Sequence, residues 1–317
     1  MTSQDTFEQS FRKHLLDLLY GQWATLGAPF SERTTSEEAE VIDPEALIWC
    51  SLEFLPTEPR LSEAVVEWLR INPHYLVRQR ILKERNRREP RTLLWQALDK
   101  RIGKAEPDFV LPSEPLHGLS SPAEVVEFSH RIGEKQSRQR REPARLGRLR
   151  KGSATLLLEA RDLLGHDIRH FLLVYLLANP HGARLREIQA WSGHAYRSLA
   201  DAADRWQAAD VVTLESGYCR LTAIEPFQQL LHIKSSKIVL VNWWTVFEIG
   251  IRLLRDLAKA RQRGFDEQSA VTKSLKREAA EKLRESGSKT DRAISSSVRY
   301  LLACFSGQES DLAAHVI

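Results

Sequence analysis

The clearest structural pattern in the chain lies between His166 and Thr222, in the sequence HDIRHFLLVYLLANPHGARLREIQAWSGHAYRSLADAADRWQAADVVTLESGYCRLT. Between Ile168 and Leu176 its apolar residues recur at three- and four-residue spacing, which predicts one buried helical face. Asn179-Pro180 then ends this helix, because proline has no amide hydrogen and clashes with the preceding turn.

Two shorter helices and a hairpin are predicted to follow. Residues 185–193 and 194–210 each carry apolar side chains on one helical face, and Ser192-Gly193 separates them. The period then changes to that of extended chain in two β-rich runs, 211–214 and 218–221. Glu215-Ser216-Gly217 joins these runs as a hairpin connection.

This order of elements resembles the winged-helix domain of bacterial transcription regulators. The resemblance covers about a fifth of the chain and rests on pattern rather than on a signature motif. It implies that the third helix enters the major groove of DNA while the second helix crosses the backbone. It also implies that the hairpin, or wing, contacts phosphate or the minor groove.

The resemblance assigns DNA contacts residue by residue. Base contacts fall at the start of the third helix, on His194, Tyr196, Arg197 and Ser198. Phosphate contacts fall on Arg184 and Arg186, at the start of the second helix, and on Arg220 of the hairpin.

Acidic residues in the same region depart from the pattern of a strong DNA reader. Asp201 and Asp204 place negative charge on the third helix, and the hairpin tip at 215–217 has no lysine or arginine. Phosphate would repel these carboxylates. The alternative is therefore that this domain packs against the rest of the chain or docks another protein.

The composition around this stretch predicts four parts: a helical N-terminal domain (1–105), a linker rich in proline and arginine (106–155), the winged-helix domain (156–232) and a helical C-terminal region for dimerisation (233–317). The predicted fold class is mostly α, with a central winged helix-turn-helix and one small β-hairpin. A helical N-terminal third fits either a plain bundle or a second helix-turn-helix-like unit.

The N-terminal third contains two sequence signals for helix starts, and many basic residues lie near its C-terminal end. Thr6 and Gln9 have capping-box spacing, and Asp43-Pro44 has the composition of a helix start. A solvated helix end or a patch facing phosphate would explain the cations. They are Arg78, Arg80, Lys83, Arg85, Arg87, Arg88 and Arg91.

The linker contains the most basic segment of the chain, residues 131–151. It has too little apolar sequence to pack alone, so it is either a solvated tether or an arm that grips DNA. The arginines assigned to DNA here are Arg138, Arg140, Arg141, Arg145 and Arg148.

The C-terminal region has a clear apolar stripe, formed by Trp243, Phe247, Ile251, Leu254 and Ala258. Such a stripe is either core or part of a dimer interface, and we expect a homodimer. The short run 238–241 fits a buried strand or the start of the next helix.

Composition indicates the cellular compartment in which the protein is expected. The 317-residue chain has three widely spaced cysteines, which suits a reducing cytoplasm rather than a disulfide framework. Its first residues do not resemble a signal peptide, and no run approaches the ~20 apolar residues of a membrane helix. We therefore expect a cytoplasmic protein that does not enter a membrane.

Enzyme motifs are absent from the sequence, so we expect no enzyme, cofactor or metal. Gly287-Ser288-Lys289-Thr290 resembles the end of a phosphate-binding loop but lacks the earlier glycine. His166 and His170 have the spacing of two metal ligands without a third, and we interpret them as a pair on an exposed first turn.

Two functions remain open at this point. The first is a dimeric transcription regulator whose partner is double-stranded DNA. The second is an interaction protein, such as the regulatory or neutralising member of a toxin–antitoxin or phage-defence pair, bound to a second protein of the same operon. The arginines of 131–150 favour the first, and Asp201 and Asp204 favour the second.

Overall fold

The predicted helix starts at the N-terminal end are confirmed. Thr6 Oγ1 accepts a hydrogen bond from the Gln9 amide at 3.3 Å, and Gln9 Oε1 accepts one from the Thr6 amide at 2.9 Å. This is a capping box. Asp43 Oδ1 accepts from the Ala46 amide at 3.1 Å, with Pro44 at the first helical position.

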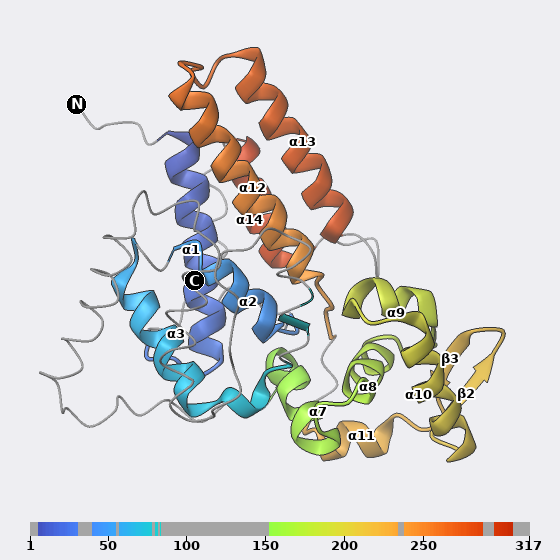
Figure 1. The fold of residues 1–317 in the computed structure, drawn as a ribbon. Helices are drawn as coiled ribbons and strands as arrows, with labels where there is room; N and C mark the ends of the chain where they lie inside the picture. The colour runs from blue at the N-terminus through green and yellow to red at the C-terminus, as the bar shows by residue number, and fades with distance from the viewer. Residues whose placement is uncertain are drawn as a thin grey trace, which may run out of the picture.

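The computed structural model describes residues 6–30, 40–54, 57–77, 80, 81, 83, 152–233, 238–287 and 295–306. These residues are mostly helical, with one small antiparallel sheet, as Figure 1 shows. Among their helices, none has the length and apolarity needed to cross a membrane.

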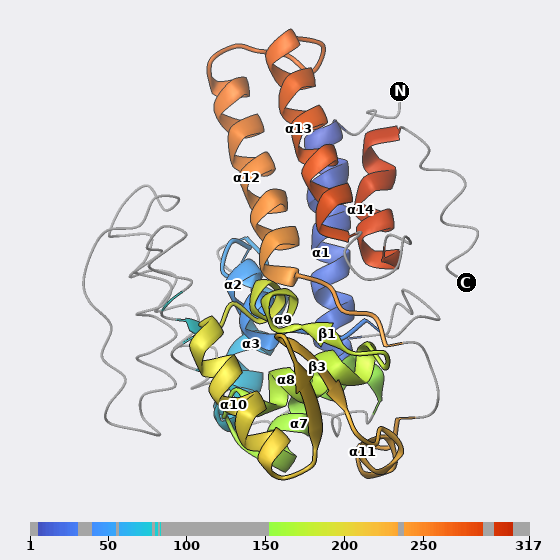
Figure 2. The same ribbon diagram turned by 90° about the vertical axis from the view of Figure 1, so that its right-hand side faces the viewer.

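Six helices form a group that we call the helical body, which contains both the first and the last described helices. In Figures 1 and 2, α12 and α13 form a pair at the top of the view, with α1 and α14 alongside it. The helices of the body are α1 (Phe7–Thr25), α2 (Pro44–Ser51), α3 (Pro59–Ile71), α12 (Trp243–Gln262), α13 (Ala270–Gly287) and α14 (Ser296–Ser306).

The elements between them form a second group, which we call the central unit. It begins with α7 (Leu156–Leu164), after the short 3-10 helices η1 (Pro73–Tyr75) and η2 (Ser153–Thr155). The other members are α8 (Arg169–Ala178), β1 (Ala183–Arg184), α9 (Leu185–Ser192), α10 (Tyr196–Ala208), β2 (Val212–Glu215), β3 (Tyr218–Leu221) and α11 (Glu225–Leu230).

The helical body has one hydrophobic core, to which both ends of the described chain contribute. Trp23 and Trp68 pack edge to face in it, with ring centroids 5.4 Å apart. Trp243 and Phe247 are fully buried, so the predicted stripe on α12 is confirmed as core. The sequence division into N-terminal and C-terminal parts differs from this packing, because periodicity marks an apolar face without identifying its partner.

The central unit has its own core, in which α8, α9 and α10 pack against the sheet. The strand order is β1-β3-β2, all antiparallel, with Ala183 opposite Cys219 and Val212 opposite Leu221. Ser216 and Gly217 both have positive φ (49° and 76°), so they form the two-residue turn between β2 and β3.

Residues 238–241 belong to neither of the elements suggested by the sequence. Val239 makes an isolated parallel bridge with Glu40, and its carbonyl accepts from the Val41 amide at 2.9 Å. Val41 in turn accepts from Trp243 Nε1 at 2.8 Å. These bonds tie the segment before α12 to the segment before α2. Val41 and Leu240 of these segments also pack in the core of the central unit.

Candidate nucleic-acid interface

The turn between α9 and α10 positions the four residues that the sequence assigns to base contacts. Gly193 ends α9 in the left-handed conformation (φ 73°), and its amide donates to the Gln189 carbonyl at 2.9 Å. Ala195 then has extended backbone, so α10 begins in a new direction at Tyr196. The first turn of α10 is consequently exposed at Tyr196, Arg197 and Ser198.

Arg186 and Tyr196 lie together on the exposed side of this turn. The Arg186 guanidinium carbon lies 5.4 Å from the centroid of the Tyr196 ring, within the range of a cation–π contact. The Tyr196 hydroxyl lies against the hairpin, since a Cβ built on Gly217 would be 3.4 Å from it. One aromatic side chain thus links α9, α10 and the hairpin turn.

The exposed side of the sheet adds two arginines to this surface. Arg184 of β1 is opposite Tyr218 of β3, and residues alternate between exposed and buried along β3. Arg184, Tyr218 and Arg220 therefore project from the same side of the sheet. We call the exposed surface formed by Arg184, Arg186, Tyr196, Arg197, Tyr218 and Arg220 the outer face.

Tyr218 was missed by the sequence reasoning, although the alternation of residues 218–221 could have indicated it. Its side chain is 43% exposed, and its hydroxyl donates to the His181 carbonyl at 3.0 Å. The Tyr218 ring therefore lies on the exposed side of the sheet, opposite Arg184 and two residues before Arg220. Three acidic residues of the central unit, Asp201, Asp204 and Glu215, are also exposed.

His194 differs from the other residues assigned to base contacts. Its ring packs inward on Phe171, with centroids 4.8 Å apart, and its Nε2 is buried without a hydrogen-bond partner among the described residues. Burial, followed by the charges of Arg80 and Lys83, lowers the pKa of His194 to about 4. The ring therefore belongs to the boundary with the helical body rather than to the outer face.

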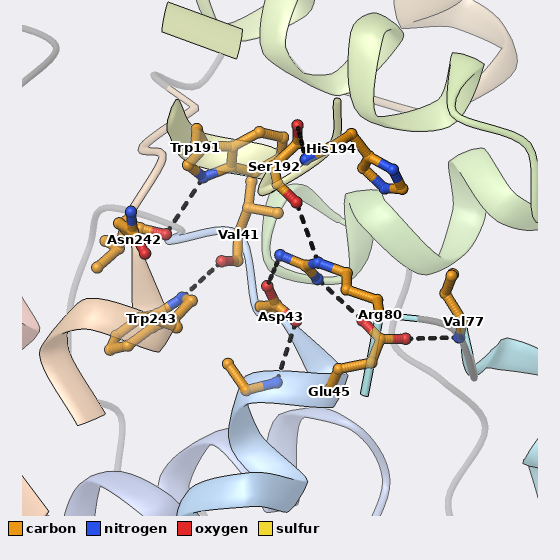
Figure 3. A network of polar contacts seen from close by, with 12 residues as sticks. Val41, Asp43, Glu45, Val77, Arg80, Trp191, Ser192, His194, Asn242 and Trp243 are labelled. Carbon is orange, nitrogen blue, oxygen red and sulfur yellow. Dashed lines mark hydrogen bonds and ion pairs between the residues drawn. The ribbon is translucent and has the colours of Figure 1, made fainter. Parts of the chain in front are cut away.

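That boundary contains a buried ionic cluster, which we call the junction, formed by Asp43, Glu45, Arg80, Arg161 and His170. Arg161 donates through both Nη atoms to Glu45, at 2.8 and 2.9 Å, which is a bidentate pair. Arg80 Nη1 also donates to Glu45, at 3.0 Å, and Arg80 Nη2 lies 2.6 Å from Asp43 Oδ2. Figure 3 shows the part of this cluster around Arg80.

The arginines of the junction stabilise the ionised form of its buried carboxylates and so offset the free-energy cost of burying them. Glu45 is fully buried, and burial alone would raise its pKa, but Arg161 and Arg80 outweigh this effect and hold the pKa at about 2. Glu45 also accepts from the Val77 amide at 2.8 Å. Its carboxylate therefore stays ionised and connects three segments of the chain.

His170 completes the junction as a neutral side chain. Its Nε2 accepts from Arg161 Nε at 3.2 Å, and its Nδ1 lies 3.2 Å from the Gly165 carbonyl oxygen, which fixes the proton on Nδ1. Burial, together with the charge of Arg161, lowers its pKa to about 2. The interpretation of His166 and His170 as an exposed pair is wrong for His170, which is 1% exposed.

Arg80 also corrects the prediction of a cationic patch at 78–91. It is 6% exposed and pairs with two carboxylates, so it cannot face phosphate. Lys83 is exposed and donates to the Gly193 carbonyl. The remaining predicted cations of this patch lie outside the described residues, as do Arg138, Arg140, Arg141, Arg145 and Arg148.

Metal binding finds no support in the described ranges, where no group of three or more potential ligands occurs. Comparisons with protein-family models, with curated proteins and with solved structures found no match to this chain.

Proposed function

We propose that the central unit is a winged helix that binds double-stranded DNA, and that the protein is a transcription regulator. The observation that carries this proposal is the outer face, where an exposed helix start is flanked by guanidinium groups. Arg197 comes from α10, Arg186 from α9, and Arg184 and Arg220 from strands β1 and β3. Within the described part of the chain, these four side chains have no carboxylate ion-pair partner.

The geometry favours a division of tasks on this face. The first turn of α10 is the exposed helical edge, so Tyr196, Arg197 and Ser198 would contact base edges in the major groove. Arg184 and Arg220 lie on the exposed side of the sheet, and from there they would contact phosphates of the DNA backbone. His194 is left out of this division because its ring packs on Phe171.

The proposal includes a homodimer, since winged-helix regulators commonly pair two half-sites. The apolar stripe of α12 is already buried within the helical body, so a second copy would use another surface. Cross-linking with measurement of the mass in solution tests this part separately from DNA binding.

Selection of duplexes from a random pool, followed by titration of the selected site, tests the proposal. We expect Arg197→Ala to weaken the selected site by about 1–3 kcal/mol while binding to unselected duplex changes little. Arg220→Ala should weaken all duplexes alike and reduce the slope of log affinity against log salt by about 1. Arg263→Ala is the matched control, because this exposed arginine follows α12 at the far end of the body.

A protein-docking function is the second candidate, and the exposed Asp201, Asp204 and Glu215 favour it. In this case the protein would be the regulatory or neutralising member of a toxin–antitoxin or phage-defence pair. Binding of a stoichiometric partner that resists salt, with no selected duplex, would support it. Recovery of a single duplex motif by the wild-type protein alone would contradict it.

A further inference from the structure

Arg80 connects the helical body to the turn that precedes α10. Its Nη atoms pair with Asp43 and Glu45 of the body, and its Nε donates to the Ser192 carbonyl at 3.1 Å (Figure 3). The guanidinium carbon also lies 4.7 Å from the Phe171 ring centroid and 5.7 Å from that of Trp244. A single buried side chain therefore contacts α2, α8, α9 and α12.

The Ser192 carbonyl lies where a hydrogen bond can fix the direction of the chain between α9 and α10. Ser192 is the last residue of α9, where carbonyl groups lack partners within the helix and favour a nearby cation. Its Oγ accepts from the His194 amide at 3.3 Å, two residues before α10 begins. Lys83 donates to the next carbonyl, that of Gly193.

We propose that Arg80 is a positioning residue for the first turn of α10, through its bond to the Ser192 carbonyl. Its body end is fixed because two carboxylates hold the guanidinium from one side. Its central-unit end fixes the backbone that sets the start of α10. Movement within the body at Asp43 or Glu45 is thereby transmitted to Tyr196 and Arg197. The consequence for DNA rests on the proposed function, whereas the positioning of the turn does not.

The test uses the full chain with Arg80→Met combined with Asp43→Asn. The second change removes the carboxylate that would lose its cation, and asparagine is an equally good helix cap. We expect amide hydrogen exchange of residues 193–199 to accelerate by about tenfold or more, beyond any change in the body. We also expect affinity for the selected duplex to fall by about tenfold, with the salt slope unchanged because Arg80 is buried.

Two further variants separate positioning from general destabilisation. Arg12→Met is the matched control, because Arg12 also packs on an aromatic ring, 4.9 Å from the Phe54 centroid, and its hydrogen bond among the described residues goes to Thr57, between α2 and α3. Arg80→Lys keeps the charge without the three-sided fork. We expect it to retain most of the thermal stability while exchange at 193–199 still accelerates.

The outcomes decide the proposal independently of DNA binding. Exchange at 193–199 that rises no more in the double variant than in Arg12→Met would overturn it. A reduced salt slope would also overturn it, because Arg80 would then contact phosphate. If the wild-type protein selects no duplex, the proposed function fails, and the exchange measurement alone still decides the role of Arg80.

Discussion

The junction and the outer face both depend on arginine, and they use it in opposite ways. In the junction, Arg80 and Arg161 are 6% and 2% exposed, and each pairs with carboxylates at 3.0 Å or less. On the outer face, Arg197 and Arg220 are exposed and have no ion-pair partner among the described residues. A buried guanidinium needs fixed anions of the protein, whereas an exposed one is available to an external anion.

This difference shows that the number of cations in a sequence segment does not locate an anion-binding surface. Arg80 belongs to a dense basic run, but its charge is already matched by Asp43 and Glu45. Arg220 is nearly isolated in sequence, but β3 holds it on an open surface. The neighbours of a cation in the fold decide whether its charge is available to a ligand.

The largest expected effect compares the same substitution in the two regions. Arg161→Met removes the bidentate partner of fully buried Glu45, so we expect the free energy of unfolding to fall by about 3–5 kcal/mol. Arg197→Met should change it by no more than about 0.5 kcal/mol, because Arg197 is exposed. Urea denaturation of both variants measures the difference, and equal losses would break the distinction between the regions.

The sequence predicted the parts of this comparison that depend on local patterns. Capping at Thr6 and Asp43, helices α8 to α10 and the turn near Gly217 follow from periodicity and turn chemistry, whereas α7 was not predicted. The position of Arg220 follows from alternation along β3. Winged-helix identity and DNA binding stay predictions.

The junction could not be predicted, because its members are far apart in the sequence. Glu45 and Arg161 are separated by 116 residues, and Arg80 and Ser192 by 112. Single-sequence patterns carry no signal for such pairs. The inward direction of His194 was missed for the same reason, because the partner that receives its ring, Phe171, lies on a different helix.

A second substitution tests whether close backbone packing stabilises the outer face, where the arginines form no ion pairs among the described residues. Gly182 has a φ of 98°, and a Cβ there would be 2.7 Å from the Cys219 carbonyl oxygen and 2.8 Å from the Tyr218 ring. We expect Gly182→Ala to lower the free energy of unfolding by about 2–4 kcal/mol, from backbone strain and overpacking together.

Gly264→Ala is the control for the strain alone. Gly264 also has positive φ (81°), but a Cβ there would meet nothing within 4 Å. We expect a loss of about 1 kcal/mol in this variant, measured by the same denaturation. If both variants lose the same amount, close packing of Gly182 beneath Tyr218 does not support the outer face.

Acid should weaken the junction before it affects the outer face. The pKa of His194 is lowered to about 4 and that of His170 to about 2, whereas in the unfolded chain each would titrate near 6.5. As pH falls below about 6.5 the unfolded state takes up protons that the folded state does not. Stability is therefore fully present above that pH and is lost as pH falls toward 4, with a limiting slope of roughly 1.4 kcal/mol per pH unit for each histidine.

Histidine variants assign this slope to the junction. His170→Asn should reduce the dependence of the free energy of unfolding on pH between 6.5 and 5 without abolishing it, because His166 and His194, whose pKa is also lowered by burial, remain. His181→Asn is the control, since His181 is exposed on the central unit. Thermal melts across this range measure the slopes, and a slope that His170→Asn leaves intact would exclude His170 as a source.

The smallest expected effect concerns Asp201, which lies one helical turn after Arg197 and is exposed. A carboxylate there repels phosphate, so we expect Asp201→Asn to strengthen binding to all duplexes by about 0.3–1 kcal/mol with little change in stability. Glu281→Gln on α13 is the matched control, because it removes an exposed carboxylate from the far side of the helical body. Titration of selected and unselected duplexes measures both effects.

Other results for Asp201→Asn would change the assignment of the outer face. A shift of preference at one base pair from cytosine to adenine would make Asp201 a base reader, because aspartate accepts from the cytosine amino group and asparagine pairs with adenine. Loss of a protein partner without any change in duplex binding would instead assign α10 to protein docking. In the junction, carboxylates within 3.0 Å of Arg80 and Arg161 are buried and hold the fold together. Asp201 and Arg197 are exposed and form no ion pair with each other among the described residues, so their charges are available to an external partner.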